Sequence, residues 1–207
     1  NANAVVGDKG NPNTTKLSYT EGSTTTNETK DSQTRTYVWK FDVLKYTKKN
    51  DTDTPLAGAK FVLYKTVDGK NYYVKVTNGK VTGWTETKAE GTVFETPDDG
   101  SFTISGLDAD TYYLEEVEAP AGYNKLAAPV KVTITASINA TTNVGTATVT
   151  YGENSTSTDT VKIENKTGVE LPSTGGVGTT IFYVIGGLLM AVAVVLLVTK
   201  KKMSATK

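Results

Sequence analysis

The chain has 207 residues, with 22 basic and 22 acidic side chains and no cysteine or histidine. These two absences exclude a disulfide framework, and they exclude any catalytic triad or metal site built on imidazole. Four basic residues and no acidic residue follow Thr174, so the part up to Thr174 is mildly acidic, which argues against nucleic acid as a partner.

Residues 1–35 contain few apolar side chains. One strand-like piece over residues 16–19 follows a turn-rich stretch over residues 7–13, and residues 20–35 are rich in Thr, Ser, Asn and Glu. A segment of that composition cannot bury enough apolar surface to fold by itself. We therefore expect a linker or long loop over residues 20–35, and we interpret residues 1–35 as the end of a preceding domain and a linker.

A strongly alternating pattern begins at Thr36. Alternation with a period of two places successive side chains on opposite faces of a strand. The face that we expect to be buried carries Tyr37, Trp39, Phe41, Val43 and Lys45. A polar turn is predicted over residues 48–54, followed by a second strand over residues 55–64 with its own alternating apolar face.

The remaining sequence to residue 167 consists of short strand candidates separated by turn signals. The candidates cover residues 72–77, 92–95, 101–105, 111–118, 130–135, 144–151 and 159–165. The pairs Asp68-Gly69, Asn78-Gly79 and Asp99-Gly100 tolerate the positive φ angles of hairpin turns. Abundant threonine, valine and tyrosine favour strands, and none of these segments has a helical period. We predict that residues 36–167 form an all-β domain, a sandwich of two antiparallel sheets.

Three polar residues fall on strand faces that otherwise carry apolar side chains: Lys45, Glu116 and Asn165. A buried charge is costly unless it is paired or neutralised, so burial should favour an uncharged amine beside a protonated acid. A simpler alternative, which the residues alone leave open, is that Lys45 reaches solvent at its strand end and pairs with Glu116.

The other chemistry-bearing patterns are weak. Asp51 and Asp53 resemble part of a calcium loop, but no glutamate follows at the position that would bind the ion through both oxygens. We expect a solvated turn there, and we assign neither a cofactor nor a metal to this chain.

Two segments of the predicted domain carry a resemblance to a known family. Residues 55–64, PLAGAKFVLY, and residues 112–123, YYLEEVEAPAGY, resemble the hallmark segments of Cna B-type domains, which are stalk and pilin modules of Gram-positive surface proteins. The second segment resembles the pilin E-box. The resemblance implies an immunoglobulin-like β-sandwich with a self-formed isopeptide bond between a lysine and an asparagine, promoted by a buried carboxyl group. Matched motif to motif, these residues are Lys45, Asn165 and Glu116. The resemblance implies that the amine attacks the carboxamide carbon of the asparagine, while the acid polarises the amide oxygen and moves the protons.

The last part of the chain contains a short motif, an apolar run and a basic tail. The motif is Leu171-Pro172-Ser173-Thr174-Gly175, and the tail begins with Lys200, Lys201 and Lys202. The apolar run covers 18 residues, 181–198, which corresponds to about 27 Å of helix and so to the hydrocarbon thickness of a bilayer. The lysines should hold their end in the cytoplasm and leave the preceding chain outside.

This order of parts resembles the cell-wall sorting signal of Gram-positive bacteria. The resemblance implies that a membrane sortase cleaves between Thr174 and Gly175 and transfers Thr174 to an amine of peptidoglycan or of a neighbouring pilin subunit. Pro172 supports it, because proline forces an extended backbone that suits a protease-like groove. The alternative from the residues alone is an ordinary single-span membrane anchor. We expect a linker over residues 168–180, a transmembrane helix over residues 181–199 and a cytoplasmic tail over residues 200–207.

Together these patterns predict a structural protein that is not an enzyme, is exported and is anchored to the cell wall, with the membrane needed only before sorting. The favoured interpretation is the C-terminal part of a pilus backbone subunit. The chain begins at Asn1 without a signal peptide although its tail requires export, so we expect a longer precursor. The alternative is a singly anchored adhesin or ancillary pilin that uses the domain as a stalk, with host surface ligands as further partners. A wall-anchored enzyme whose catalytic domain lies upstream is a third class.

Overall fold

The computed structural model describes residues 4–22, 25–152, 156–157 and 159–168, together with residues 184–186, 188–190 and 192. The chain divides after Gly168 into two units, and the first contains almost all described residues. The sorting motif over residues 171–175 lies outside the described residues, as do the basic tail and much of the predicted transmembrane helix. Within the described part of the chain, no helix is both long and apolar enough to cross a membrane.

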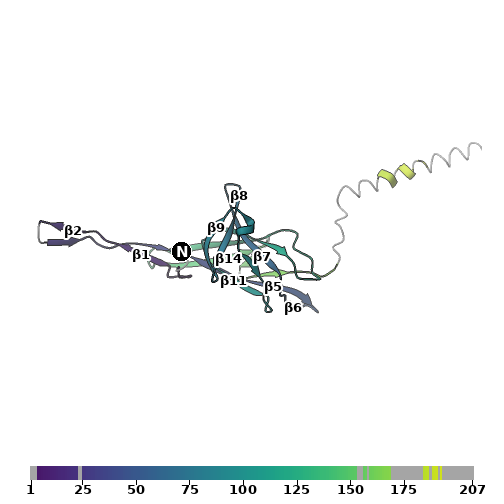
Figure 1. Ribbon diagram of the computed structural model, residues 1–207, viewed down its shortest axis with the longest axis horizontal. Helices are drawn as coiled ribbons and strands as arrows, with labels where there is room; N and C mark the ends of the chain where they lie inside the picture. Colours follow the sequence, from purple (N-terminus) through teal and green to yellow (C-terminus); the bar gives the residue numbers. More distant parts are fainter. Residues whose placement is uncertain are drawn as a thin grey trace, which may run out of the picture. The chain divides into compact units, whose positions relative to one another are not determined.

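Twelve of the described strands form one curled sheet (Figure 1). Its spatial order is β15 (Thr156–Ser157), β14 (Val144–Tyr151), β13 (Val130–Asn139), β12 (Thr111–Glu118), β7 (Lys60–Val67), β8 (Lys70–Thr77), β9 (Lys80–Thr85), β11 (Ser101–Leu107), β5 (Trp39–Lys49) and β16 (Thr160–Glu164). Two further strands join its side: β10 (Val93–Glu95) pairs with β7, and β6 (Thr52–Pro55) pairs with β5. The predicted all-β class is confirmed.

The sheet narrows to a single residue pair between β9 and β11, where Lys80 lies opposite Ser105. The strands on the two sides of this junction form two layers, and apolar side chains from both layers join one core cluster. Among the described strands, most neighbours are antiparallel, but β11 is parallel to β9, and β16 runs parallel to β5 with Ile163 opposite Lys45. The first and last strands of the domain are therefore neighbours, a pairing that the sequence alone did not specify.

The core follows the alternation that the sequence predicted. Phe41, Val43 and Lys45 of β5 are at most 1% exposed. The other layer contributes the equally buried side chains Phe61, Leu63, Tyr112 and Leu114. Full burial of one such apolar side chain contributes roughly 1.5–3 kcal/mol, so this core is the main source of the domain's stability.

Several strand boundaries differ from the predicted ones. The predicted polar turn over residues 48–54 is a tight hairpin between β5 and β6, in which Asn50 and Asp51 have φ angles of 49° and 60°. Two successive positive φ angles match the right-handed twist of the flanking strands. β9 was not predicted, because Gly83 in its middle interrupts the apolar alternation. β7 begins at Lys60 rather than at residue 55.

Residues 11–36, which we call the ribbon, contain two strand pairs. The sequence predicted one strand-like piece over residues 16–19 and a linker or long loop over residues 20–35. β1 (Asn11–Thr15) pairs with β4 (Ser32–Thr36), and β2 (Ser18–Glu21) pairs with β3 (Thr25–Glu28), both antiparallel. The expectation of a loop was wrong because a lack of apolar residues prevents a core but not strand pairing, for which threonine is well suited. The assignment of residues 1–35 to the end of a preceding domain stays a prediction.

The segment before the ribbon is hydrogen-bonded to the domain. The Gly7 N–H donates to the Val38 carbonyl at 3.1 Å, and the Gly145 N–H donates to the Asp8 carbonyl at 2.8 Å. Gly10, with a φ of 60°, packs so closely on Tyr37 that a Cβ atom there would lie 2.7 Å from the ring. Residues 7–10 therefore connect the base of the ribbon to the start of β5 and to β14.

Candidate functional site: a buried lysine, glutamate and asparagine

Three segments bring Lys45, Glu116 and Asn165 to one place in the core. Lys45 lies on the inward face of β5, and Asn165 directly follows β16, where its N–H donates to the Tyr46 carbonyl at 2.9 Å. Glu116 comes from β12, which pairs with neither β5 nor β16. The side chains of the site therefore come from both layers and meet in the core between them. All three residues predicted from the sequence lie together.

The three side chains form a chain of contacts. The Lys45 Nζ donates to the Asn165 Oδ1 at 2.6 Å and to the Ile163 carbonyl at 3.1 Å. The Asn165 Nδ2 donates to the Glu116 Oε1 at 2.8 Å, and this oxygen is 3.9 Å from the Lys45 Nζ. The other carboxyl oxygen, Oε2, accepts the Leu126 N–H at 2.8 Å. Lys45 is 0% exposed, and Glu116 and Asn165 are 1% exposed.

Burial shifts the protonation of Lys45. Removal from water disfavours the ammonium form and lowers the pKa of Lys45 to about 8, although the negative charges of Glu116 and Glu164 oppose part of this shift. A larger fraction of this amine is therefore neutral near neutral pH than of an ordinary lysine. Only the neutral amine has the lone pair that a nucleophile needs.

The contacts decide what Glu116 can do chemically. From the resemblance, we expected the acid to polarise the amide oxygen of Asn165. The structure instead places the Glu116 Oε1 beside Nδ2, whereas the amide oxygen faces Lys45. This arrangement puts the carboxyl group where it can deliver a proton to the amide nitrogen, and the amine within reach of the carbonyl group.

Gly100 holds the backbone of Lys45, a role that sequence reasoning missed. The Lys45 N–H donates to the Gly100 carbonyl at 2.8 Å, and the Leu56 N–H donates to the Lys45 carbonyl at 2.9 Å. Gly100 has a φ of 70°, and a Cβ atom there would collide with the Lys45 carbonyl oxygen. The sequence showed the glycine but suggested a hairpin turn at Asp99-Gly100; of that pair only Gly100 has a positive φ.

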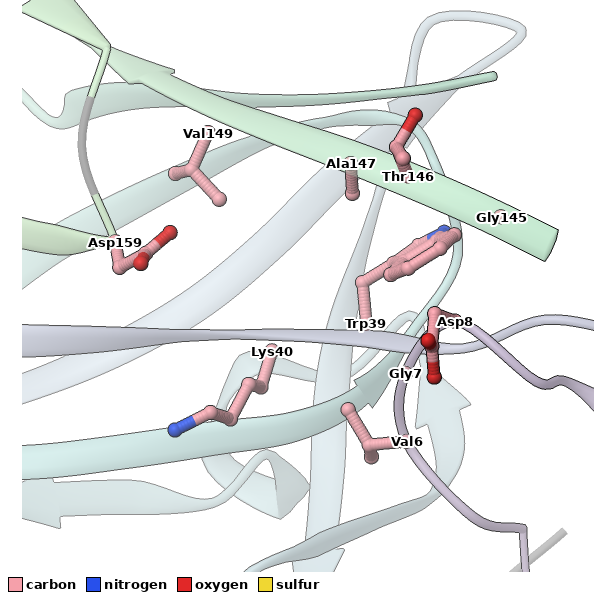
Figure 2. Close-up of a pocket in the computed structure, with 10 residues that line it drawn as sticks. All are labelled: Val6, Gly7, Asp8, Trp39, Lys40, Gly145, Thr146, Ala147, Val149 and Asp159. Atoms are coloured by element: carbon pink, nitrogen blue, oxygen red, sulfur yellow. The ribbon is translucent and has the colours of Figure 1, made fainter. Parts of the chain in front are cut away.

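A separate cavity of about 420 Å³ lies where residues 6–8 meet β5 and β14. Figure 2 shows Trp39 beside β14, with the carboxylates of Asp8 and Asp159 at opposite ends of the cavity and Lys40 pointing away from Asp8. Its charged groups do not converge on one point, so the cavity has no evident chemistry. Among the described residues, no group of three or more carboxylates is placed to hold a metal ion.

Comparison with protein families gives two matches that together cover most of the chain. Residues 42–148, just over half of the chain, match the family described as SpaA, a prealbumin-like fold domain. Residues 163–204 match the LPXTG cell wall anchor motif. A search of curated proteins gives no match.

Several solved structures are similar to this chain. The group B streptococcus pilus 2b backbone protein is 28% identical with a TM-score of 0.48, over 72% of this chain and 50% of that one. GBS52, the minor pilin of Streptococcus agalactiae, is 27% identical with a TM-score of 0.40, over 66% and 48%. The shaft pilin spaA of Lactobacillus rhamnosus GG is 18% identical with a TM-score of 0.43, over 69% and 50%. The chain thus spans about half the length of each of these proteins.

Proposed function

We propose a function for this chain on one premise: it belongs to the family of SpaA prealbumin-like fold domains. Its LPXTG motif makes it a cell-wall-anchored, pilin-like surface protein of a Gram-positive bacterium. The proposed role is that of a pilus backbone subunit, which a sortase polymerises and attaches. In this role the domain transmits force, and it has no external substrate to convert.

The second part of the proposal is an intramolecular isopeptide bond between Lys45 and Asn165, promoted by Glu116. One observation carries it: a carboxamide contacts an amine at 2.6 Å and a carboxyl group at 2.8 Å, and all three side chains are at most 1% exposed. A simple ion pair would not need an asparagine between its partners, and the asparagine here separates the amine from the acid.

The proposed reaction is balanced by the groups present. The neutral Lys45 Nζ attacks the Asn165 Cγ, a carbon–nitrogen bond forms, and the bond from Cγ to Nδ2 breaks. One proton leaves Nζ and one proton is added to Nδ2, so that a secondary amide and one ammonia result. Glu116 accepts the first proton and delivers the second, for which its contact with Nδ2 is suitable.

Mass spectrometry of residues 1–174 tests the bond. We expect a mass lower than the sequence mass by one ammonia, and a branched peptide joining Lys45 to Asn165 after digestion. Lys45→Ala, Asn165→Ala and Glu116→Ala should each restore the full mass, because each removes a reacting group or the proton carrier. A full sequence mass for folded and aged parent protein would contradict the bond, and Lys45 and Glu116 would then be interpreted as an ion pair.

Cell fractionation tests the sorting role of Thr174. We expect the parent protein to be bound covalently to the wall, and Thr174→Ala to stay in the membrane fraction and dissolve in detergent. Equal wall attachment of Thr174→Ala would contradict sortase processing at this residue. High-molecular-weight ladders from wall extracts would support polymerisation, whereas a single wall-bound species would favour the singly anchored adhesin or ancillary pilin.

A further inference from the structure

The segment that follows β12, residues 119–129, is attached to the site at two points. The Leu126 N–H donates to the Glu116 Oε2 at 2.8 Å. Two residues earlier, the Asn124 N–H donates to the Lys166 carbonyl at 2.9 Å, and Lys166 directly follows Asn165. The segment thus contacts both the acid and the end of the closing strand, and we call it the positioning loop.

The first contact restricts the orientation of the acid. The terminal torsion of a glutamate side chain has a broad, roughly two-fold preference, so the carboxyl plane is not fixed by rotamer preference. With Oε2 bound to the Leu126 N–H, Oε1 is directed at the Asn165 Nδ2. A carboxyl group that rotated freely would meet the amide in the productive orientation for only part of the time.

The second contact makes that orientation depend on the last strand. The Lys166 carbonyl reaches the Asn124 N–H only when β16 is paired beside β5 and the chain continues past Asn165. The loop also contains a turn, in which the Tyr123 N–H donates to the Pro120 carbonyl and Gly122 has a φ of 85°. These contacts connect the closing strand to the loop and the loop to the acid.

We propose that the backbone N–H of Leu126 positions Glu116 for formation of the isopeptide bond, and that the positioning loop makes this step conditional on docking of β16. This inference rests on the proposed bond between Lys45 and Asn165. It assigns a function to a main-chain group and makes formation of the bond depend on correct folding of the domain. The covalent bond closes only after the two strands that it joins are in register.

A competing explanation is that the loop only covers the site. The Leu126 side chain is half-buried and packs against the core, so its removal would also loosen the loop. The two explanations differ in the atom that matters. If the loop is a cover, the side chain of Leu126 decides the rate of bond formation; if it positions the acid, the N–H decides it.

Replacement of the peptide bond before Leu126 by an ester removes the N–H and keeps the side chain. The parent, this ester and a control ester before the exposed Ala127 are assembled from synthetic segments in denaturant, so that all start without the cross-link. After refolding, ammonia loss is followed by mass spectrometry. We expect the Leu126 ester to react about tenfold to a hundredfold more slowly than the parent, the range for a misplaced catalytic group. The Ala127 ester should react at the parent rate.

Leu126→Ala separates the two explanations, because it keeps the N–H and loses the side chain. It should react faster than the Leu126 ester even though its unfolding midpoint, measured in a Lys45→Ala background, is lower. A Leu126→Ala rate as slow as that of the ester, or an ester rate equal to that of the parent, would overturn the inference. If the parent itself loses no ammonia, the proposed bond fails instead, so the two failures are distinguishable.

Hydrogen exchange gives an answer even if the ester variant does not fold. In the Lys45→Ala protein the Leu126 N–H should exchange slowly, and the additional change Glu116→Ala should accelerate its exchange while amides of β7 stay protected. Equal exchange in the two proteins would show that the N–H does not hold the acid, and would overturn the inference.

Discussion

The ribbon of residues 11–36 and the domain of residues 39–165 are both built from paired strands, but different forces support the pairing. In β1, β2 and β4 nearly every side chain is exposed, whereas β5 alternates between buried and partly exposed residues. An isolated two-stranded hairpin is only marginally stable in water. The comparison shows that strand propensity creates pairing, while a core is needed both for stability and to hide a reactive amine from water.

The two regions also differ in how they meet a pulling force. Asn11 lies opposite Thr36 at the base of the ribbon, so tension along the chain separates its strands one pair at a time. In the domain, β16 lies parallel to β5, so tension between the start of β5 and the end of β16 shears all their pairs at once. The proposed bond joins these same two strands.

Removal of the proposed bond should produce the largest difference in stability between a change in the domain and a change in the ribbon. Lys45→Ala should lower the free energy of unfolding by roughly 5 kcal/mol, by analogy with loop closure by a disulfide, and the melting temperature by about 10–20 °C. The matched change in the ribbon is Lys16→Ala, which removes an exposed ion pair with Glu28 and should cost at most about 1 kcal/mol. Thermal unfolding followed by circular dichroism measures both. Similar melting temperatures for the two variants would contradict the bond.

Single-molecule pulling between residues 1 and 168 should separate the regions directly. We expect the ribbon to open at low force and add roughly 9 nm of extension, while the domain stays closed because the load passes through Lys45 and Asn165. In Lys45→Ala a further extension of roughly 40 nm should appear as the domain unfolds. The large step in the parent protein would be incompatible with a covalent link.

Gly100→Ala tests whether Gly100 constrains the backbone of Lys45 within the domain. The new Cβ atom would collide with the Lys45 carbonyl, and an alanine would have to adopt a φ of 70°. We therefore expect the free energy of unfolding to fall by about 3 kcal/mol and ammonia release to be slower. Gly69→Ala is the control, because Gly69 has a φ of 77° but open space around it, and it should cost only about 1–2 kcal/mol. Denaturant unfolding in a Lys45→Ala background measures the stability, and equal losses would show that Gly100 does not constrain Lys45.

The pH dependence should report the burial of Lys45. Because its pKa is lowered to about 8, the neutral amine becomes scarcer as pH falls below that value, and the rate of ammonia release should fall about tenfold per pH unit. In Asn165→Ala, which keeps the amine, a pKa of Lys45 below the ordinary lysine value of 10.5 means that the folded state resists protonation. Stability should therefore decrease as pH falls from above 10.5 towards 8. Refolding time courses and unfolding midpoints across pH test this, and a rate independent of pH would argue against attack by the amine.

Residue parity predicted that Lys45, Glu116 and Asn165 face inward, whereas the resemblance to Cna B-type domains singled them out as a set. Alternation is a local property, so the faces of Lys45, Glu116 and Asn165 follow from the residues next to them, and all three are buried in the structure. Local patterns were less reliable where a glycine stands in a strand, as at Gly83, and where polar strands pair without a core, as in the ribbon. In those places neighbours in space, not neighbours in sequence, decide the conformation.

The sequence by itself determined the class of fold and the inward faces of the strands, including those of Lys45, Glu116 and Asn165, because these depend on residue type and spacing. Only the tertiary structure decided that β16 lies parallel to β5, that Gly100 supports the backbone of Lys45 and that the Leu126 N–H binds Glu116. Apart from proline, every residue carries the same backbone groups, so the sequence does not reveal which N–H will meet a buried acid. That choice depends on long-range packing, which brings residues 116, 126 and 165 together from three segments.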